Sequence, residues 1–324
     1  MPHLLHRRLA DLEGAESALV LASGRAAVAC TALALLRPGD HLLSSMWLRP
    51  ETRHFFAQEL PALGVEVSYV DPRETRGWRR GLSRTTRALF VESPVLESGR
   101  LLDLRPPRTL TQELGLALIV DATAASPVNF TPIAHGVDIV LHDATLFLDG
   151  HGQGEAGVVA GTEGLVEEVR LKMETWGALP HPLARVQLDN GLATLEVRVQ
   201  RQNSTAQQLA EWAEGYPDVS AVLYAGLASH PDRSAFEEWF KGAGATVHLR
   251  LREQLHADIA PDVPQIAAHA SALLAGAPGA RNVITHIAPG GDAGWLRVHV
   301  GLESVDTIIA ALVSAISAPS PFSS

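Results

Sequence analysis

The 324-residue chain is poor in the residue types that form disulfides, carry amines or stack on ligands. It contains one cysteine, Cys30, which excludes an intrachain disulfide and a thiolate metal cluster. Cys30 lies among alanines and a valine, so we expect a buried apolar residue and not a reactive thiol. Lysine occurs only as Lys172 and Lys241, and aromatic residues make up 5% of the chain. Because alanine and leucine are abundant, the core is expected to consist mainly of aliphatic side chains.

Long apolar runs and long basic runs are also absent from the sequence. No stretch approaches the roughly 18 apolar residues of a membrane helix, and the first residues lack the apolar segment of a signal peptide. The formal net charge of −10 argues against non-specific nucleic-acid binding, because that binding requires a positive surface. The composition therefore predicts a globular protein of the cytoplasm with no membrane or nucleic-acid partner.

Short apolar runs alternate with helical patterns in the first half of the chain, which is typical of βαβ units. Because the runs are apolar throughout, we expect mostly parallel strands that are covered on both faces. The expected strands are 65–70, 88–91, 116–120 and 137–141, and the expected helices are 24–36, 50–63 and 163–174.

The character of the sequence changes after about residue 175, at a turn-rich junction over 176–182. A helical pattern over about 190–214 follows, and residues 318–324 are expected to be frayed. The pattern predicts a large α/β domain over 1–175 and a smaller α/β domain over 176–324. The elements expected beyond the long helix are strands near 220–224, 246–250 and 295–300 and helices near 264–274 and 303–317.

The Gly-x-Gly-x-x-Gly spacing of a dinucleotide-binding loop occurs at Gly152, Gly154 and Gly157. That loop must open a helix, whereas residues 158–161 resemble a strand, so we expect no dinucleotide site. By contrast, Ser23 precedes the helix expected at 24–36, where it can cap the helix or help its free N–H groups to hold an anion.

Three histidines lie near aspartates and raise the question of a metal site: His135, His142 and His151. No pair of them has the spacing of a His-Glu-x-x-His motif. Scattered histidines beside strands are usually packed or surface residues. We therefore expect no metal ion.

Taken together, several segments resemble the Cys/Met-metabolism family of pyridoxal-phosphate (PLP) enzymes, which includes cystathionine γ-synthases, cystathionine lyases and related sulfhydrylases. These segments are residues 12–27, 36–41, 91–94, 120–123, 136–161, 193–198, 224–231 and 295–303. The resemblance implies the fold-type I, aminotransferase-like α/β fold, with a mixed, mostly parallel seven-stranded sheet and a smaller C-terminal domain. It also implies that the chain starts just after the family's N-terminal arm, which carries a Tyr-x-Arg that reaches the phosphate of a neighbouring subunit.

The resemblance places Leu146 where the family has the lysine that holds the cofactor and moves the substrate proton. Leucine has no amine, so we expect no covalent PLP binding and no standard PLP catalysis. Three further positions depart from the family pattern. Asp143 stands for the serine that binds the phosphate, Arg49 for the tyrosine that stacks on the ring, and Leu96 for an asparagine at the ring hydroxyl.

Other positions match the family and imply a vestigial or weak cofactor site. The resemblance assigns Ser23, Gly24 and Arg25 to the phosphate cradle. It further assigns Asp121 to the pyridine nitrogen, Thr145 to the place beside the lysine, and Arg297 to the carboxylate of the substrate.

The sequence therefore predicts a degenerate homologue of the trans-sulfuration enzymes, which lacks standard PLP catalysis and acts as a partner or regulatory subunit or has a redirected activity. Two alternatives stay open. The first is an active PLP-dependent C–S lyase or γ-replacement enzyme of sulfur amino-acid metabolism, with an amine supplied by another chain. The second is an amino-acid sensor that uses Arg297. The resemblance implies a homodimer, or a heteromer with an intact paralogue.

Overall fold

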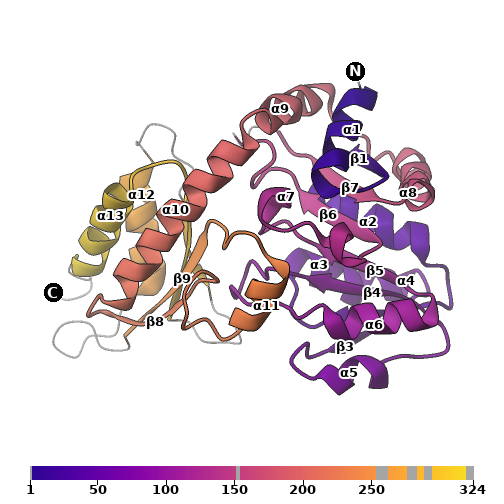
Figure 1. Ribbon diagram of the computed structural model, residues 1–324, viewed down its shortest axis with the longest axis horizontal. Helices are drawn as coiled ribbons and strands as arrows, with labels where there is room; N and C mark the ends of the chain where they lie inside the picture. Colours follow the sequence, from indigo (N-terminus) through magenta and orange to yellow (C-terminus); the bar gives the residue numbers. More distant parts are fainter. Residues whose placement is uncertain (1, 151–153, 253–261, 276–282, 288–293, 319–324) are drawn as a thin grey trace. The chain divides into compact units, whose positions relative to one another are not determined.

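Figure 1 shows the computed structural model, which describes residues 2–150, 154–252, 262–275, 283–287 and 294–318. The chain divides into two compact units. The first unit comprises Met1–Val95, Leu101–Glu196 and Glu237–Lys241, and the second comprises Leu96–Arg100, Val197–Phe236 and Gly242–Ser324.

The first unit is built on a seven-stranded sheet with the order β1-β7-β6-β5-β4-β2-β3. Its strands are β1 (Ser17–Leu21), β2 (His41–Ser45), β3 (Glu66–Val70), β4 (Thr86–Glu92), β5 (Ala117–Asp121), β6 (Ile139–Asp143) and β7 (Gly157–Gly161). Neighbouring strands from β3 to β6 pair in parallel, while β7 pairs antiparallel with both β6 and β1. This topology confirms the mixed, mostly parallel seven-stranded sheet that the resemblance implies.

Helices connect the strands and cover the sheet (Figure 1). They are α1 (Pro2–Glu13), α2 (Gly24–Leu35), α3 (Pro50–His54), α4 (Leu60–Ala62), α5 (Thr75–Arg80), α6 (Arg105–Leu114), α7 (Ser126–Asn129), α8 (Glu163–Trp176) and α9 (Pro182–Leu192). A π-helical segment, Phe55–Glu59, joins α3 to α4, and a 3-10 turn, Pro132–His135, precedes β6. Helix α2 packs on α8, β6 and β7, and its Ala27 is completely buried. As expected, this core is mainly aliphatic.

The second unit contains a four-stranded antiparallel sheet with the order β10-β11-β9-β8. Its core joins these strands to three helices, with Leu249, Val298 and Leu312 fully buried. The strands are β8 (Val219–Leu223), β9 (Thr246–Leu251), β10 (Val283–Ile287) and β11 (Trp295–His299), and the helices are α10 (Leu195–Glu214), α12 (Val263–Leu274) and α13 (Val305–Ser317). Helix α11 (Arg233–Trp239) crosses from the second unit into the first.

The division between the units differs from the boundary expected after residue 175. Helix α9 and the first two residues of α10 belong to the first unit. Arg8 of α1 forms an ion pair with Asp189 of α9, and Gly191 packs so closely on the backbone of Asp149 that a Cβ would lie 2.1 Å from its carbonyl oxygen. The helix expected over 190–214 is accordingly two helices, with a turn at residues 193 and 194.

None of the helices in the described parts of the chain is long and apolar enough to span a membrane. The tail that we expected to be frayed lies, from residue 319 onward, outside the described residues.

Candidate functional site

The carboxyl ends of three neighbouring strands bring three acidic side chains to one edge of the sheet. Glu92 ends β4, Asp121 ends β5 and Asp143 ends β6. Glu92 is in direct register with Asp121 on the adjacent strand. In open α/β sheets this edge is where ligands bind. Arg49 reaches the same edge from the loop after β2.

Arg49 is the single cation at the centre of this acidic cluster. Its Nη2 donates to Oδ2 of Asp121 at 2.5 Å, and its backbone N–H donates to Oε2 of Glu92 at 2.8 Å. Its Nη1 also lies 3.9 Å from Oδ2 of Asp143 and 3.7 Å from Oε1 of Glu51. Arg49 is 7% exposed and Asp121 is 1% exposed, so water does not screen their contact.

The second oxygen of Asp121 is held by Thr123. Oδ1 accepts hydrogen bonds from the Thr123 backbone N–H at 3.0 Å and from its hydroxyl at 2.5 Å. The same hydroxyl accepts a hydrogen bond from the backbone N–H of Asp143 at 2.8 Å, which links the ends of β5 and β6. Both oxygens of Asp121 are therefore engaged within the chain.

These contacts determine the ionisation of the buried pair. Burial raises the pKa of Asp121, but the charge of Arg49 and the hydrogen bonds from Thr123 and Arg49 outweigh it, so the pKa lies below its ordinary value. Burial lowers the pKa of Arg49, but Asp121 and Glu92 hold that pKa above its ordinary value. Asp121 and Arg49 are therefore both charged at neutral pH.

Asp143 lies against the start of α2. Its Oδ1 accepts hydrogen bonds from the backbone N–H of Thr145 at 3.1 Å and from the Thr145 hydroxyl. A Cβ on Gly24 would lie 2.7 Å from the Cβ of Asp143, so only glycine fits there. Ser23 caps α2, since its Oγ accepts from the Ala26 N–H at 3.1 Å. The carboxylate of Asp143 thus stands beside the helix end that could otherwise receive an anion.

The resemblance places Leu146 and Arg25 at the cofactor site and the two lysines outside it, and none of the four forms a hydrogen bond or ion pair with the central arginine of this cluster in the described part of the chain. Leu146 follows Thr145 in the turn after β6 and is partly buried. Arg25 is exposed on the first turn of α2. Lys172 lies within α8, and Lys241 lies just after α11.

In the second unit, Arg297 of β11 is paired with a carboxylate of its own chain. Its Nη1 donates to Oε1 of Glu97 at 2.6 Å, with 19% of the Arg297 side chain and 34% of the Glu97 side chain exposed. Sequence reasoning missed Glu97, because nothing in its local pattern marks it as a partner of a residue 200 positions later.

The segment that carries Glu97, residues 96–100, is fixed to the second unit at several points. The Nε2 atoms of His248 and His230 lie 3.1 Å from the carbonyl oxygens of Leu96 and Gly99. Arg100 forms a two-pronged ion pair with Asp232 at 2.6 and 2.7 Å. These contacts hold Glu97 in place beside Arg297.

The residues at the strand edge do not fit PLP. Leu146 has no nitrogen that could hold the cofactor covalently. Arg49 occupies the oxygen of Asp121 that would have to face a pyridine nitrogen. Asp143 brings a negative charge to the start of α2, and a phosphate there would be repelled by about 1 to 4 kcal/mol per unit charge, depending on screening.

The weaker sequence motifs have structural explanations. His142 pairs with Glu13 at 2.6 Å with both side chains buried, and His135 packs on Phe130 and Trp239. Within the described ranges, no three histidine, cysteine, aspartate or glutamate side chains form a group that could hold a metal ion. His151 and Gly152 lie outside the described residues.

Gly157, the last glycine of the dinucleotide-like spelling, begins β7 and not a helix. A Cβ there would lie 2.1 Å from the carbonyl oxygen of Ser23. Close packing of β7 on the start of α2 therefore explains this glycine, and no nucleotide is needed to account for it.

The order and directions of the seven strands are the architecture of a fold-type I PLP enzyme. The sequence matches the Cys/Met metabolism PLP-dependent enzyme family over residues 1–317, and the chain belongs to this family.

Individual relatives agree with this membership. L-methionine gamma-lyase of Pseudomonas putida is 31% identical over 98% of this chain and 83% of its own length. Cystathionine gamma-synthase 1, chloroplastic, of Arabidopsis thaliana is 35% identical over 76% of this chain, but the match spans only 44% of that relative. The crystal structure of MetB from Corynebacterium glutamicum superimposes with a TM-score of 0.87 at 25% identity, covering 96% of this chain and 83% of that one.

Proposed function

We propose that this chain is a degenerate member of its family that has lost lysine-dependent PLP catalysis and acts as a partner or regulatory subunit. The observation that carries the proposal is the buried ion pair between Arg49 and Asp121. Asp121 has both oxygens engaged by Arg49 and Thr123, so it has no free oxygen to offer a cofactor ring.

A cofactor ring could use Asp121 only after Arg49 withdrew from it. Withdrawal would leave Asp121 and Glu92 buried without their cation, and breaking a buried pair costs about 3 to 5 kcal/mol. Non-covalent PLP would have to supply this free energy without the covalent bond that Leu146 cannot form. The balance therefore favours a protein that folds and works without the cofactor.

The contact between Arg297 and Glu97 argues against the amino-acid sensor. A free amino acid would have to displace the carboxylate of Glu97, which lies 2.6 Å from Arg297. Because Glu97 belongs to the same chain, its carboxylate is always at high local concentration. As a partner subunit, the chain would need only its fold and its surface. We propose that it associates with a second copy or with an intact paralogue, and co-purification from the native source followed by mass analysis tests this association.

The cofactor part of the proposal is tested by absorbance. The full chain is incubated with excess PLP, its visible spectrum is recorded, and borohydride is added before peptide mapping. We expect no protein-bound band and no modified lysine for the wild type. A band that borohydride fixes to Lys172 or Lys241, or turnover of cystathionine or an acylated homoserine, would contradict the proposal.

Two variants make this test sharper. Leu146→Lys alone should bind PLP poorly, because Arg49 still occupies Asp121 and Asp143 still repels a phosphate. Leu146→Lys combined with Arg49→Tyr should bind it better, because Asp121 is then free. Equal binding by the single and the double variant would show that Arg49 does not block the site.

A further inference from the structure

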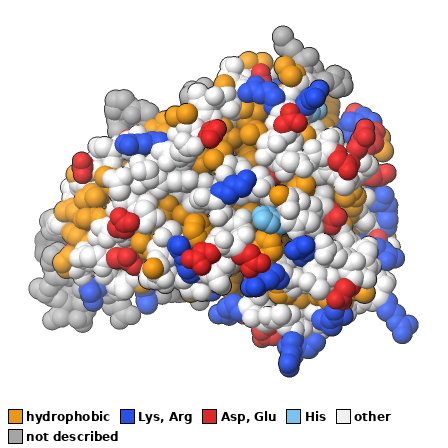
Figure 2. Space-filling model, viewed as in Figure 1, with side chains coloured by type: hydrophobic (Ala, Val, Ile, Leu, Met, Phe, Trp, Pro, Cys, Tyr) orange, Lys and Arg blue, Asp and Glu red, His pale blue; other side chains and the backbone are white. Residues whose placement is uncertain are grey.

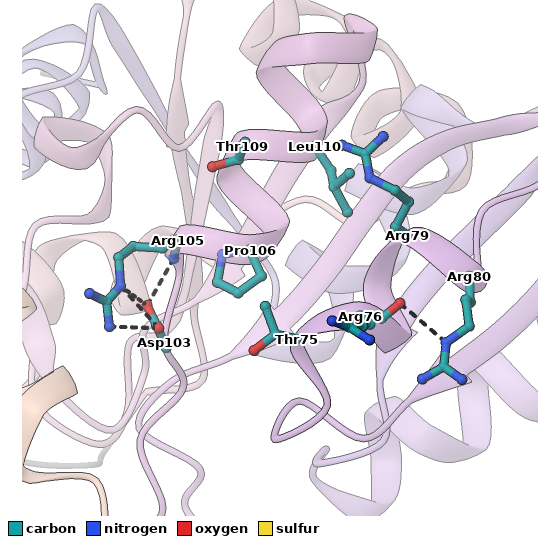
Figure 3. A pocket seen from close by; sticks show the side chains of 9 residues that line it. All are labelled: Thr75, Arg76, Arg79, Arg80, Asp103, Arg105, Pro106, Thr109 and Leu110. Atoms are coloured by element: carbon teal, nitrogen blue, oxygen red, sulfur yellow. Dashed lines mark hydrogen bonds and ion pairs between the residues drawn. The ribbon is translucent and has the colours of Figure 1, made fainter.

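A pocket with an arginine-rich lining lies between α5 and α6 of the first unit. Its volume is about 990 Å³, at the upper end of the range for small-molecule sites. Figure 3 shows the two helices side by side, with Thr75 and Pro106 facing each other across the pocket. The lining residues are Thr75, Arg76, Arg79 and Arg80 on α5, with Asp103, Arg105, Pro106, Thr109 and Leu110 on and before α6.

Each helix presents one continuous stripe to this pocket. The lining residues of α5 and of α6 both follow the spacing i, i+1, i+4 and i+5, which places them on one helical face. Helix α5 is held firmly, because Trp78 is fully buried and a Cβ on Gly77 would lie 2.7 Å from Val70 of β3. The pocket is therefore formed by the packed scaffold.

The charge of the lining is strongly positive. Four arginines and one carboxylate, Asp103, line the pocket; Asp103 binds Arg105 at 2.9 Å, and Arg105 also lies 3.3 Å from Glu238. Within the described parts of the chain, Arg76 has no ion pair. Arg79 contacts Glu113 at 2.5 Å, and Arg80 contacts Glu74 at 3.4 Å. Both pairs are largely exposed, and exposed ion pairs contribute little to stability.

Helix stability does not explain Arg76, and Arg105 is held by Asp103 and Glu238 and not by the helix dipole. Cations favour the last turn of a helix, which accounts for Arg79 and Arg80. Arg76 and Arg105, however, lie in the first turns of their helices, where a cation opposes the helix dipole, and neither first turn contains an acidic residue.

The arginines are also concentrated in this part of the sequence. Six of the 24 arginines fall within residues 73–87, together with a single acidic residue, although the chain carries a formal net charge of −10. Figure 2 shows Lys and Arg side chains gathered over the region where α5 lies in Figure 1. An anion in the pocket would account for this arrangement.

We propose that the pocket between α5 and α6 binds a phosphate-bearing small molecule of about the size of a nucleoside diphosphate. Guanidinium groups match phosphate oxygens in a two-pronged geometry, and the hydroxyls of Thr75 and Thr109 supply further donors. Pro106 and Leu110 form an apolar surface for the rest of the ligand. The site goes beyond the proposed partner function and does not depend on it.

Calorimetry on the full chain tests the proposal with three probes: ADP, pyrophosphate and citrate. We expect ADP to bind more tightly than pyrophosphate because of its apolar part, and citrate, which is anionic but has no phosphate, to bind more weakly than both. Binding should weaken as salt increases. No measurable heat with ADP at millimolar concentration, or citrate binding as tightly as pyrophosphate, would overturn the proposal.

Arg76→Gln is the decisive variant, because Arg76 is exposed and its loss leaves the fold intact. The dissociation constant for ADP should rise at least about tenfold. The matched control is Arg170→Gln in α8, an exposed arginine that contacts Glu167 and Glu174. Equal effects of the two variants, with circular dichroism unchanged, would show only a general loss of positive charge.

Discussion

Replacing Arg49 by methionine removes the one cation at the acidic edge of the sheet and keeps much of its apolar volume. Asp121, at 1% exposure, then loses its partner at 2.5 Å, and Glu92, at 2% exposure, loses a guanidinium nitrogen at 3.9 Å. The backbone N–H of residue 49 still donates to Glu92, so the main effect falls on Asp121.

We expect Arg49→Met to lower the free energy of unfolding of the first unit by about 3 to 5 kcal/mol at pH 7, because it leaves a buried carboxylate without its counter-charge. Urea unfolding gives the total loss, and hydrogen exchange of the β5 amides assigns it to the first unit. The matched control is Arg79→Met, which breaks an exposed ion pair and should cost less than about 1 kcal/mol.

A double-mutant cycle separates the pair from other effects of the substitution. Asp121→Asn combined with Arg49→Met removes both charges, so the double variant should be more stable than the sum of the two single losses predicts. Strictly additive losses would show that Arg49 and Asp121 do not interact in solution.

The pH dependence gives an independent check with a defined sign. In the wild type the pKa of Asp121 is lowered, so its contribution is present above the unfolded value of about 3.9 and is lost as pH falls through the folded value. Without Arg49, burial dominates and raises that pKa, so acid relieves the variant. The difference between wild type and Arg49→Met should therefore shrink from pH 7 towards pH 4, and a difference that does not change with pH would refute the reasoning.

Three further predictions concern other buried groups. Burial lowers the pKa of His248 and of His299 to about 4, so the unfolded state binds more protons than the folded state below pH 6.5. Each histidine should therefore lower the free energy of unfolding of the second unit by about 2 kcal/mol between pH 6.5 and 5. NMR titration of the ring protons checks this, and ordinary pKa values would refute it. Burial raises the pKa of Cys30 to about 11, so a disulfide reagent should label it only after unfolding, and rapid labelling of the native protein would contradict this. Gly157→Ala should destabilise the protein by at least about 1 to 3 kcal/mol in thermal unfolding, because the new Cβ would lie 2.1 Å from the carbonyl oxygen of Ser23. The control Gly164→Ala should not destabilise it, because there is open space around Gly164.

Much of the sheet could be predicted because its strands are marked by apolar runs. The runs at 88–91, 116–120 and 137–141 became β4, β5 and β6, since strands buried on both faces need apolar side chains throughout. Strand β2 (His41–Ser45) was not predicted because three of its five side chains are polar, although all five residues are buried. The break before α10 was missed because it depends on tertiary packing of Gly191 against a distant backbone.

The site was only partly predictable. The resemblance grouped Arg49, Leu96, Asp143 and Leu146 as departures within one cofactor pocket, but it did not indicate that Arg49 pairs with Asp121. Arg49 and Asp121 are 72 residues apart in the sequence, so no local pattern indicates that their side chains are in contact. One signal was available: a lone arginine after one strand and acidic residues at the ends of three neighbouring strands carry complementary charges.

This charge complementarity explains why a cation lies beside Asp121. Asp121 is fixed by the end of β5 and by Thr123, so it cannot turn towards water. Its buried charge needs a partner, and Arg49 supplies one from the loop after β2. A lysine at position 146 would not release Asp121 by itself, because Asp121 would remain paired. Under the proposed function, PLP binding therefore requires removing Arg49 as well as adding the amine.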